Sequence, residues 1–185
     1  LREEERVTSE GTTENASIYT TQSMLRQELS LVRLAEKLGE QQSHATREDD
    51  VQAAIDRANE RFAKQGSRLS PDQIDALRHI TKGDQLSCIV GYAGAGKSTT
   101  FKAAKEVWEA SGYKVYGLAP TGRAAQNLEE IGLSSQTLHK FLKDYHDGRS
   151  RYHRNSVLVL DEAGMVDVGR FNDLLQAVDH LGVKL

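Results

Sequence analysis

The stretch "GYAGAGKSTT", residues 91–100, follows the apolar run "LSCIV". Gly91, Gly96, Lys97 and Ser98 match the pattern G-x-x-x-x-G-K-[S/T] at every defined position. Glycines let the chain turn tightly, so that successive backbone N–H groups can point toward one phosphate. A helix predicted to follow adds its unpaired N-terminal N–H groups and the positive end of its dipole. The stretch therefore predicts a phosphate-binding loop between a strand and a helix, rather than a chance glycine-rich turn.

The residues of this loop have distinct expected roles. Ala93, Gly94 and Ala95 keep the loop small enough for its backbone to touch a phosphate. Lys97 supplies a mobile charge for the β- and γ-phosphates, and the Ser98 hydroxyl can ligate Mg²⁺. The residues expected to bind the nucleotide here are Gly91, Gly94, Ala95, Gly96, Lys97, Ser98 and Thr99.

A second acidic site is expected where the run "SVLVLDE" ends, at Asp161 and Glu162. Ligands of open α/β sheets bind at the carboxyl ends of the strands. Asp161 would hold Mg²⁺, usually through water, and Glu162 would polarise the water that attacks the phosphate. Alone, two acids at a strand end would be solvated surface residues; beside the glycine loop they complete a catalytic set with Lys97. The chain has no N-K-x-D segment that would read guanine.

The pattern after Gly83 alternates between strands and helices. Strands are predicted over 86–91, 113–120 and 156–162, and "VKL" at 183–185 reads as the opening of a fourth. Helices are predicted over 98–111, 122–132, 137–145 and 168–181. This alternation indicates an α/β fold with a parallel sheet. Cys88, inside the first strand, is expected to be a small core residue.

The first 68 residues have a different character. Residues 1–17 are polar and aperiodic, which predicts a frayed tail, and residues 18–68 form a helical segment before an ATP-binding lobe over 69–185. On the first helix Leu25, Leu29 and Val32 form an apolar stripe, with Leu31, Ala35 and Leu38 beside it. The second helix is predicted to open with a capping box at Thr46. The third, at the start of the lobe, has Ser70 as N-cap, with Gln73 completing a capping box.

The composition restricts the class of protein. The net charge is −3 and the pI is about 6.1, so no global positive field indicates nucleic acid, although a local groove can still be basic. With one cysteine the chain can form no internal disulfide, and no apolar run is long enough to span a bilayer. These features favour a soluble protein of the cytoplasm.

Several stretches resemble motifs of RecD-like superfamily-1 helicases. "LSPDQIDAL" is similar to the Q motif, "GYAGAGKSTT" to motif I, "LAPTGRAAQNL" to motif Ia, "SSQTLHKFL" to motif Ib and "VLVLDEAGM" to motif II. The combination resembles the helicase part of TraA-type conjugative relaxases, strongly over 69–185 and more weakly over the helical segment. The resemblance implies a RecA-like P-loop lobe.

The resemblance also implies roles for individual residues. Gln73 matches the position that contacts adenine, in addition to its expected capping role. Pro120, Thr121, Gly122 and Arg123 match motif Ia, and Thr137 and His139 match motif Ib; both motifs face single-stranded DNA. A solvated surface position is the alternative for Arg123, and a surface or half-buried histidine the alternative for His139.

The function implied is the first motor lobe of an ATP-dependent DNA helicase that uses ATP and Mg²⁺ to move along single-stranded DNA. The chain stops at "GVKL", where the family continues into motif III. A second RecA-like lobe and a relaxase domain would lie elsewhere, so the isolated chain is expected to hydrolyse ATP poorly. One alternative is a non-catalytic module that binds single-stranded DNA or recruits a partner. Another is an unrelated P-loop ATPase, which the register of the motifs argues against.

Overall fold

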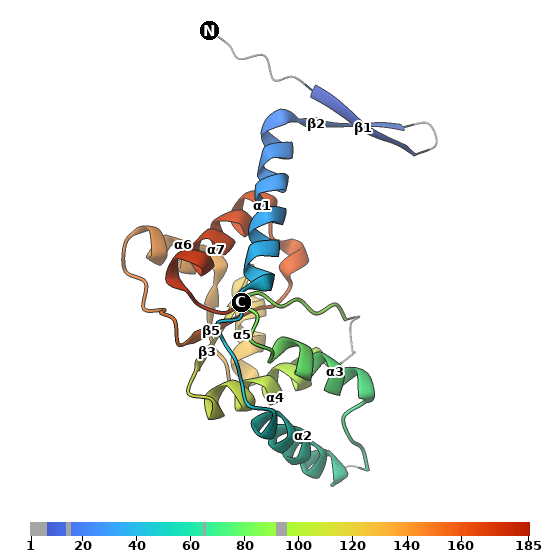
Figure 1. Cartoon of the computed structure of the whole chain (residues 1–185), viewed down its shortest axis with the longest axis vertical. Coiled ribbons are helices and arrows are strands. Elements are labelled where there is room, and N and C mark those ends of the chain that lie inside the picture. The colour runs from blue at the N-terminus through green and yellow to red at the C-terminus, as the bar shows by residue number, and fades with distance from the viewer. Residues whose placement is uncertain (1–6, 14–15, 65, 92–95) are drawn as a thin grey trace.

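A computed structural model describes residues 7–13, 16–64, 66–91 and 96–185. Its centre is a three-stranded parallel sheet (Figure 1), in which β3 (Lys114–Ala119) lies between β4 (Ser134–Thr137) and β5 (Ser156–Leu160). Along the chain α4 (Lys97–Ala110) precedes β3, α5 (Gly122–Glu130) and α6 (Leu138–His146) connect the three strands, and α7 (Val168–Leu181) follows β5. The predicted α/β fold with a parallel sheet is confirmed.

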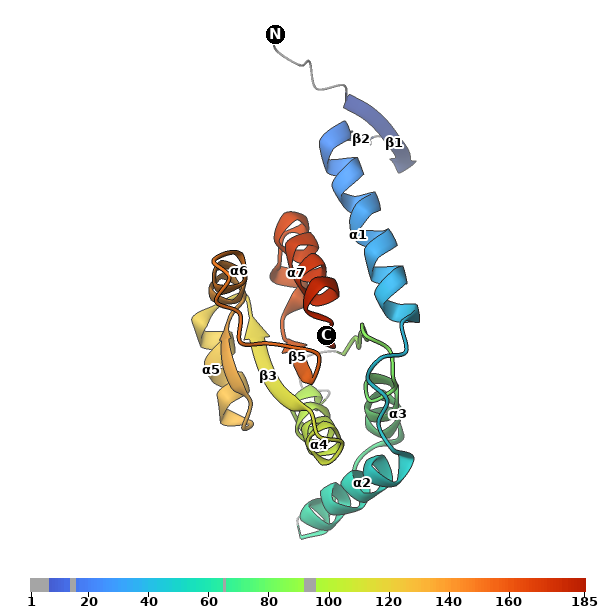
Figure 2. The same cartoon turned by 60° about the vertical axis from the view of Figure 1, so that its left-hand side comes forward.

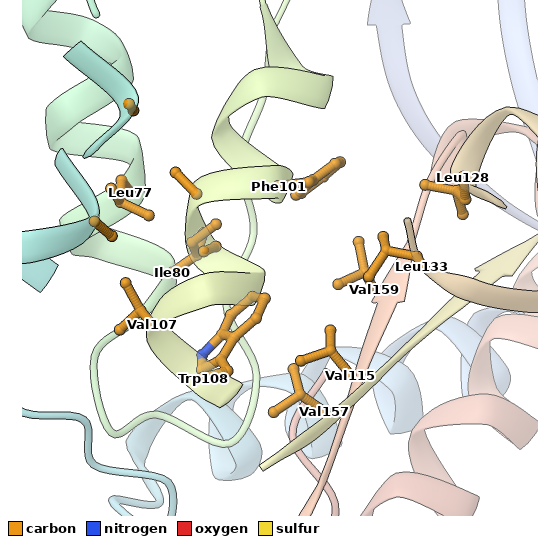
Figure 3. Close-up of a cluster of buried hydrophobic side chains, with 14 of the residues drawn as sticks. Leu77, Ile80, Phe101, Val107, Trp108, Val115, Leu128, Leu133, Val157 and Val159 are labelled. Carbon is orange, nitrogen blue, oxygen red and sulfur yellow. The ribbon is translucent and has the colours of Figure 1, made fainter. Parts of the chain in front are cut away.

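Both faces of the sheet are covered, because successive side chains of a strand point to opposite sides. Val157 and Val159 of β5 join a buried cluster with α4, whereas Leu158 joins a second buried cluster with α7. Figure 3 shows the first cluster, in which Val157 and Val159 face Trp108 and Phe101 of α4. This double coverage explains why β5 reads as a continuous apolar run.

The helical segment before the lobe packs on both of these faces. α1 (Gln22–Glu40) lies beside α7 (Figure 2), and its Leu38 is fully buried in the second cluster. α2 (Glu48–Ala63) packs on α4 through Val51, Ala54, Ile55 and Ala58, and α3 (Pro71–Ile80) joins the same cluster. Arg57 and Arg61 of α2 also pair with Glu106 of α4, at 3.0 and 2.8 Å.

The start of the chain differs from the frayed tail expected over 1–17. β1 (Val7–Thr13) pairs antiparallel with β2 (Ala16–Thr21), and this hairpin leads directly into α1 (Figure 1). Threonine, valine, isoleucine and tyrosine, which favour extended backbone, are frequent in both segments. Local β-propensity therefore explains a hairpin that hydrophobic periodicity does not predict.

The predicted strand over 86–91 is wrong as a regular element. Ser87 N donates to Leu185 O (2.9 Å) and Leu185 N donates to Gln85 O (2.8 Å), so pairing reaches Ser87. Beyond it, no backbone hydrogen bond joins residues 88–90 to another described residue. Cys88 is exposed, so its prediction as a core residue is also wrong. Residues 88–90 thus have strand-like side chains without a hydrogen-bonded strand beside them among the described residues.

The opening of a fourth strand at 183–185 is supported by its contacts. Val157 of β5 forms a parallel bridge with Lys184. Lys184 N donates to Ser156 O, and Leu158 N donates to Lys184 O. Residues 183–185 therefore lie between β5 and residues 85–87, which brings the segment that leads into the glycine loop alongside the sheet.

The start of α2 and the packed face of α1 also differ from expectation. Thr46 does not cap α2: its hydroxyl donates to Thr81 O (2.7 Å), and Arg47 occupies the N-cap position without a side-chain hydrogen bond. On α1, Leu29 and Val32 are about half exposed, since the helix packs on α7 through Leu31, Leu34, Ala35 and Leu38 instead. The capping box at Ser70 and Gln73 is confirmed, with both hydrogen bonds present.

Candidate functional site

Gly91 and Gly96 are the described ends of the glycine loop. Gly96 has a left-handed backbone conformation (φ +78°) and forms the N-cap of α4. Lys97, the first residue of α4, donates from Nζ to Gly91 O at 2.7 Å, which joins the two ends of the loop. Gly94 and Ala95 lie outside the described residues. Of the context that the motif requires, the structure has the glycine at position 96 and the helix that begins at Lys97.

Gln73 lies directly against this loop. A Cβ atom at Gly96 would fall 2.0 Å from Gln73 Nε2, so only glycine leaves room for the amide. The amide oxygen accepts from Ser70 N at 2.9 Å, which fixes the side chain while its nitrogen faces Gly96. The capping role and the position beside the loop are therefore compatible in one conformation.

Asp161 and Glu162 follow the last residue of β5. Asp161 N donates to Leu118 O (3.0 Å), so the end of β5 is tied to β3, and Asp161 Oδ1 accepts from Glu162 N (2.9 Å). Glu162 has φ 54° and ψ 37°, the only positive φ of a non-glycine residue in the described part of the chain. Such conformations cost free energy and cluster at functional sites.

One cavity brings the two halves of the predicted site together. Its volume is about 540 Å³, and it is lined by Gly91 and Lys97 on one side and by Asp161 and Glu162 on the other. Ser98 and Thr99 lie in the first turn of α4, where Ser98 is exposed and Thr99 half-buried. In the described residues there is no group of three or more His, Cys, Asp or Glu side chains with metal-binding geometry.

The residues predicted to face DNA gather at the same edge of the sheet. Ala119 of β3 is in register with Thr137 of β4, and Leu118 is in register with Leu160 of β5. Thr121 and Thr137 are N-caps: their hydroxyls accept from Ala124 N (3.1 Å) and Lys140 N (3.2 Å). The other members of the set surround these caps: Pro120 is half-buried, and Gly122, Arg123 and His139 are exposed.

Two buried polar residues, Lys184 and His44, were not predicted. Lys184 is 1% exposed, and its Nζ donates to Lys82 O, Asp84 O and Ser87 Oγ. His44 is fully buried, with Nε2 3.0 Å from Arg154 O, and burial lowers its pKa. The burial of Lys184 could have been inferred from its place between the apolar residues of "GVKL". The sequence around His44 has no feature that indicates its burial.

Comparison with known proteins identifies the class of the lobe. A family model described as "AAA domain" matches residues 68–185, more than half of the chain. The chain belongs to this AAA domain family. The parallel sheet, its covering helices and the match together define a RecA-like α/β lobe preceded by helices.

The relatives include conjugation proteins and a helicase. The chain is 37% identical, over 90% of its length, to the "Probable conjugal transfer protein TraA" of Sinorhizobium fredii. It is 34% identical over 60% of its length to the "Multifunctional conjugation protein TraI" of Escherichia coli, and 35% identical over 60% to the "ATP-dependent RecD2 DNA helicase" of Deinococcus radiodurans. The chain spans 14%, 7% and 16% of these proteins, respectively. The resemblance to TraA and RecD-like proteins is confirmed.

No helix in the described residues is both long and apolar enough to cross a membrane.

Proposed function

We propose that the chain is the ATP-binding first motor lobe of a DNA helicase in a conjugative-transfer relaxase. In the longer protein, ATP hydrolysis at this lobe would drive movement along single-stranded DNA. The observation that carries the proposal is the shared cavity of Lys97 and Asp161, two residues from distant motifs. The relative named an ATP-dependent DNA helicase supports the motor activity, and the TraA and TraI relatives, named as conjugation proteins, support the role in conjugative transfer.

The proposed chemistry follows from the donors around that cavity. Lys97 would neutralise the β- and γ-phosphates, while the N–H groups at the start of α4 bind their oxygens. Asp161 and the Ser98 hydroxyl are oxygen donors of the kind that Mg²⁺ prefers, and a bound Mg²⁺ keeps several waters and takes few protein ligands. The ion would neutralise charge that develops on the phosphates during transfer.

The remaining residues would orient the reactants. Glu162 would accept a hydrogen bond from the attacking water, and its fixed backbone conformation would aim the carboxylate. The Gln73 amide nitrogen beside Gly96 would donate to an acceptor on the adenine ring. Arg123 and His139, at the carboxyl edge of the sheet, would contact the DNA strand together with the backbone around Gly122.

A nucleotide titration tests this proposal. We expect a fluorescent ATP analogue to bind the chain in the presence of Mg²⁺, and Lys97→Ala to weaken binding at least about 10-fold, since a charge-assisted bond to phosphate is lost. Lys102→Ala, an exposed lysine of the same helix, is the matched control and should leave affinity unchanged. Equal affinity of wild type and Lys97→Ala would overturn the proposal.

A further inference from the structure

A second cavity lies at the outer edge of the sheet, away from Lys97 and Asp161. This edge groove, of about 620 Å³, is bounded by α5, β4, α6 and residues 149–152. β4 is the terminal strand of the sheet, paired with β3 on its inner side. Its outer side pairs with no described strand, and Ser135 to Thr137 line the groove. The groove therefore follows an open strand edge, which presents unpaired backbone N–H and C=O groups.

The charges of the groove are largely neutralised by one another. Asp144 accepts from Lys140 (2.7 Å) and from Arg149 (3.3 Å), and these two partners lower its pKa. Arg149 also pairs with Asp147 at 2.6 Å. Glu129 of α5 adds a further carboxylate to the opposite wall. A polyanion along this groove would therefore meet carboxylates on both walls and cations already engaged.

Arg151 is the exception. No carboxylate among the described residues lies within ion-pair distance of its guanidinium, which donates from Nη2 to the Tyr152 hydroxyl at 3.4 Å. The guanidinium carbon lies 5.3 Å from the Tyr116 ring centre and 5.4 Å from that of Tyr152. Tyr152 is buried and meets Tyr116 edge to face, so the two rings form a fixed support. The groove thus holds one oriented cation beside the open edge.

We propose that the edge groove binds an extended peptide, which adds to β4 as a further strand and places an acidic side chain against Arg151. An extended chain satisfies the open backbone groups of an edge strand, and pockets for alternate side chains provide selectivity. The volume of the groove lies within the usual range for ligand sites. This inference does not depend on nucleotide binding.

The test uses the ¹⁵N-labelled chain without nucleotide or Mg²⁺. The probes are acetyl-Thr-Val-Glu-Val-Thr-amide and four relatives in which the glutamate occupies each other position, at up to about 1 mM. We expect at least one probe to shift the amide signals of Ser134 to Thr137 and the side-chain signal of Arg151. The same peptide with alternate amides N-methylated should shift none of them, because it cannot complete the ladder.

Variants separate the role of Arg151 from general binding. Arg151→Gln should weaken the best glutamate peptide about 10-fold, and leave the affinity for its glutamine counterpart unchanged. Arg33→Gln, an exposed arginine on α1, is the matched control and should bind like wild type. The inference is overturned if no probe shifts the β4 signals, or if Arg151→Gln binds the glutamate peptide like wild type. It is also overturned if a ten-residue oligothymidine shifts the β4 signals while all peptides are silent, which would make the groove a nucleic-acid surface.

Discussion

On one face of the sheet lie α4 and α5, with α2 and α3 packed against α4, and on the other lie α1, α6 and α7 (Figure 2). The first face supports the glycine loop: α3 carries Gln73, α4 begins at Lys97, and α2 packs against α4. The helices of the second face support β5 and the chain end, and of the predicted site residues they carry only His139. This difference predicts that truncations on the first face lower nucleotide affinity more than equivalent truncations on the second.

A matched pair of core truncations gives the largest expected effect. Leu77 in α3 and Leu175 in α7 are both fully buried, one on each face. Leu77→Ala and Leu175→Ala should each lower the free energy of unfolding by about 2–5 kcal/mol, measured by urea titration. Only Leu77→Ala should also weaken nucleotide binding, since it loosens the helix that carries Gln73. Equal losses of affinity in the two variants would contradict the division by face.

Lys184, between β5 and residues 85–87, predicts a pH dependence of stability. Burial lowers its pKa from 10.5 to about 8, with Asp84 opposing the change. Between these values the unfolded chain binds more protons than the folded chain, so the free energy of unfolding should rise as the pH increases from 8 to 10.5. The rise is on the order of 3 kcal/mol. Lys184→Met should remove it; a variant that keeps the wild-type slope in urea titrations would refute the assignment.

Substitutions at two helix caps compare the two faces with a smaller loss of stability than the core truncations. Ser70 caps α3 on the first face, and Asp167 caps α7 on the second, each through a hydrogen bond to the helix backbone. Ser70→Ala and Asp167→Ala should each lower the free energy of unfolding by about 1 kcal/mol. We expect Ser70→Ala alone to reduce nucleotide affinity, because the capping box that orients Gln73 is broken. The titration described for Lys97 measures this difference.

The exposed stripe of α1 should give the smallest effect. Leu29 belongs to the apolar stripe seen in the sequence, yet its side chain is 48% exposed. Leu29→Gln should change the free energy of unfolding by less than about 0.5 kcal/mol. Leu38→Ala, at a fully buried position of the same helix, should cost about 2–5 kcal/mol. A large loss from Leu29→Gln in a thermal or urea unfolding experiment would show that this stripe is covered.

Elements with strong local signals could be predicted from the sequence. The apolar run of β5 and the helix over Val168–Leu181 agree with their predicted positions. β4 was missed because "SSQT" is short and polar, and its strand conformation comes from pairing with β3. Residues 88–90 have strand-like residues, but no strand in the described part of the chain pairs with them, which no local pattern reveals. Local propensity thus predicts the conformation of a segment whose own residues favour it, and fails where the conformation depends on pairing with another strand.

In the candidate site, too, some features follow from local sequence and others depend on packing between elements. The spacing of Gly91, Gly96 and Lys97 predicted a loop before a helix, and α4 begins at Lys97. The contact of the Gln73 amide with Gly96 could not be predicted, because it depends on how α3 packs on α4. The same holds for the caps at Thr121 and Thr137, whose hydroxyls are engaged by their own helices.

The most direct test of the account is a map of the nucleotide site by NMR, with the ¹⁵N-labelled chain and a slowly hydrolysed ATP analogue plus Mg²⁺. We predict that the largest shifts fall at Gly91, at Gly96 to Thr99 and at Asp161 to Ala163, together with the Gln73 side-chain amide. This result would join the two distant motifs in one nucleotide site. Shifts confined to the edge groove, or none at Gly96 to Thr99, would contradict the account.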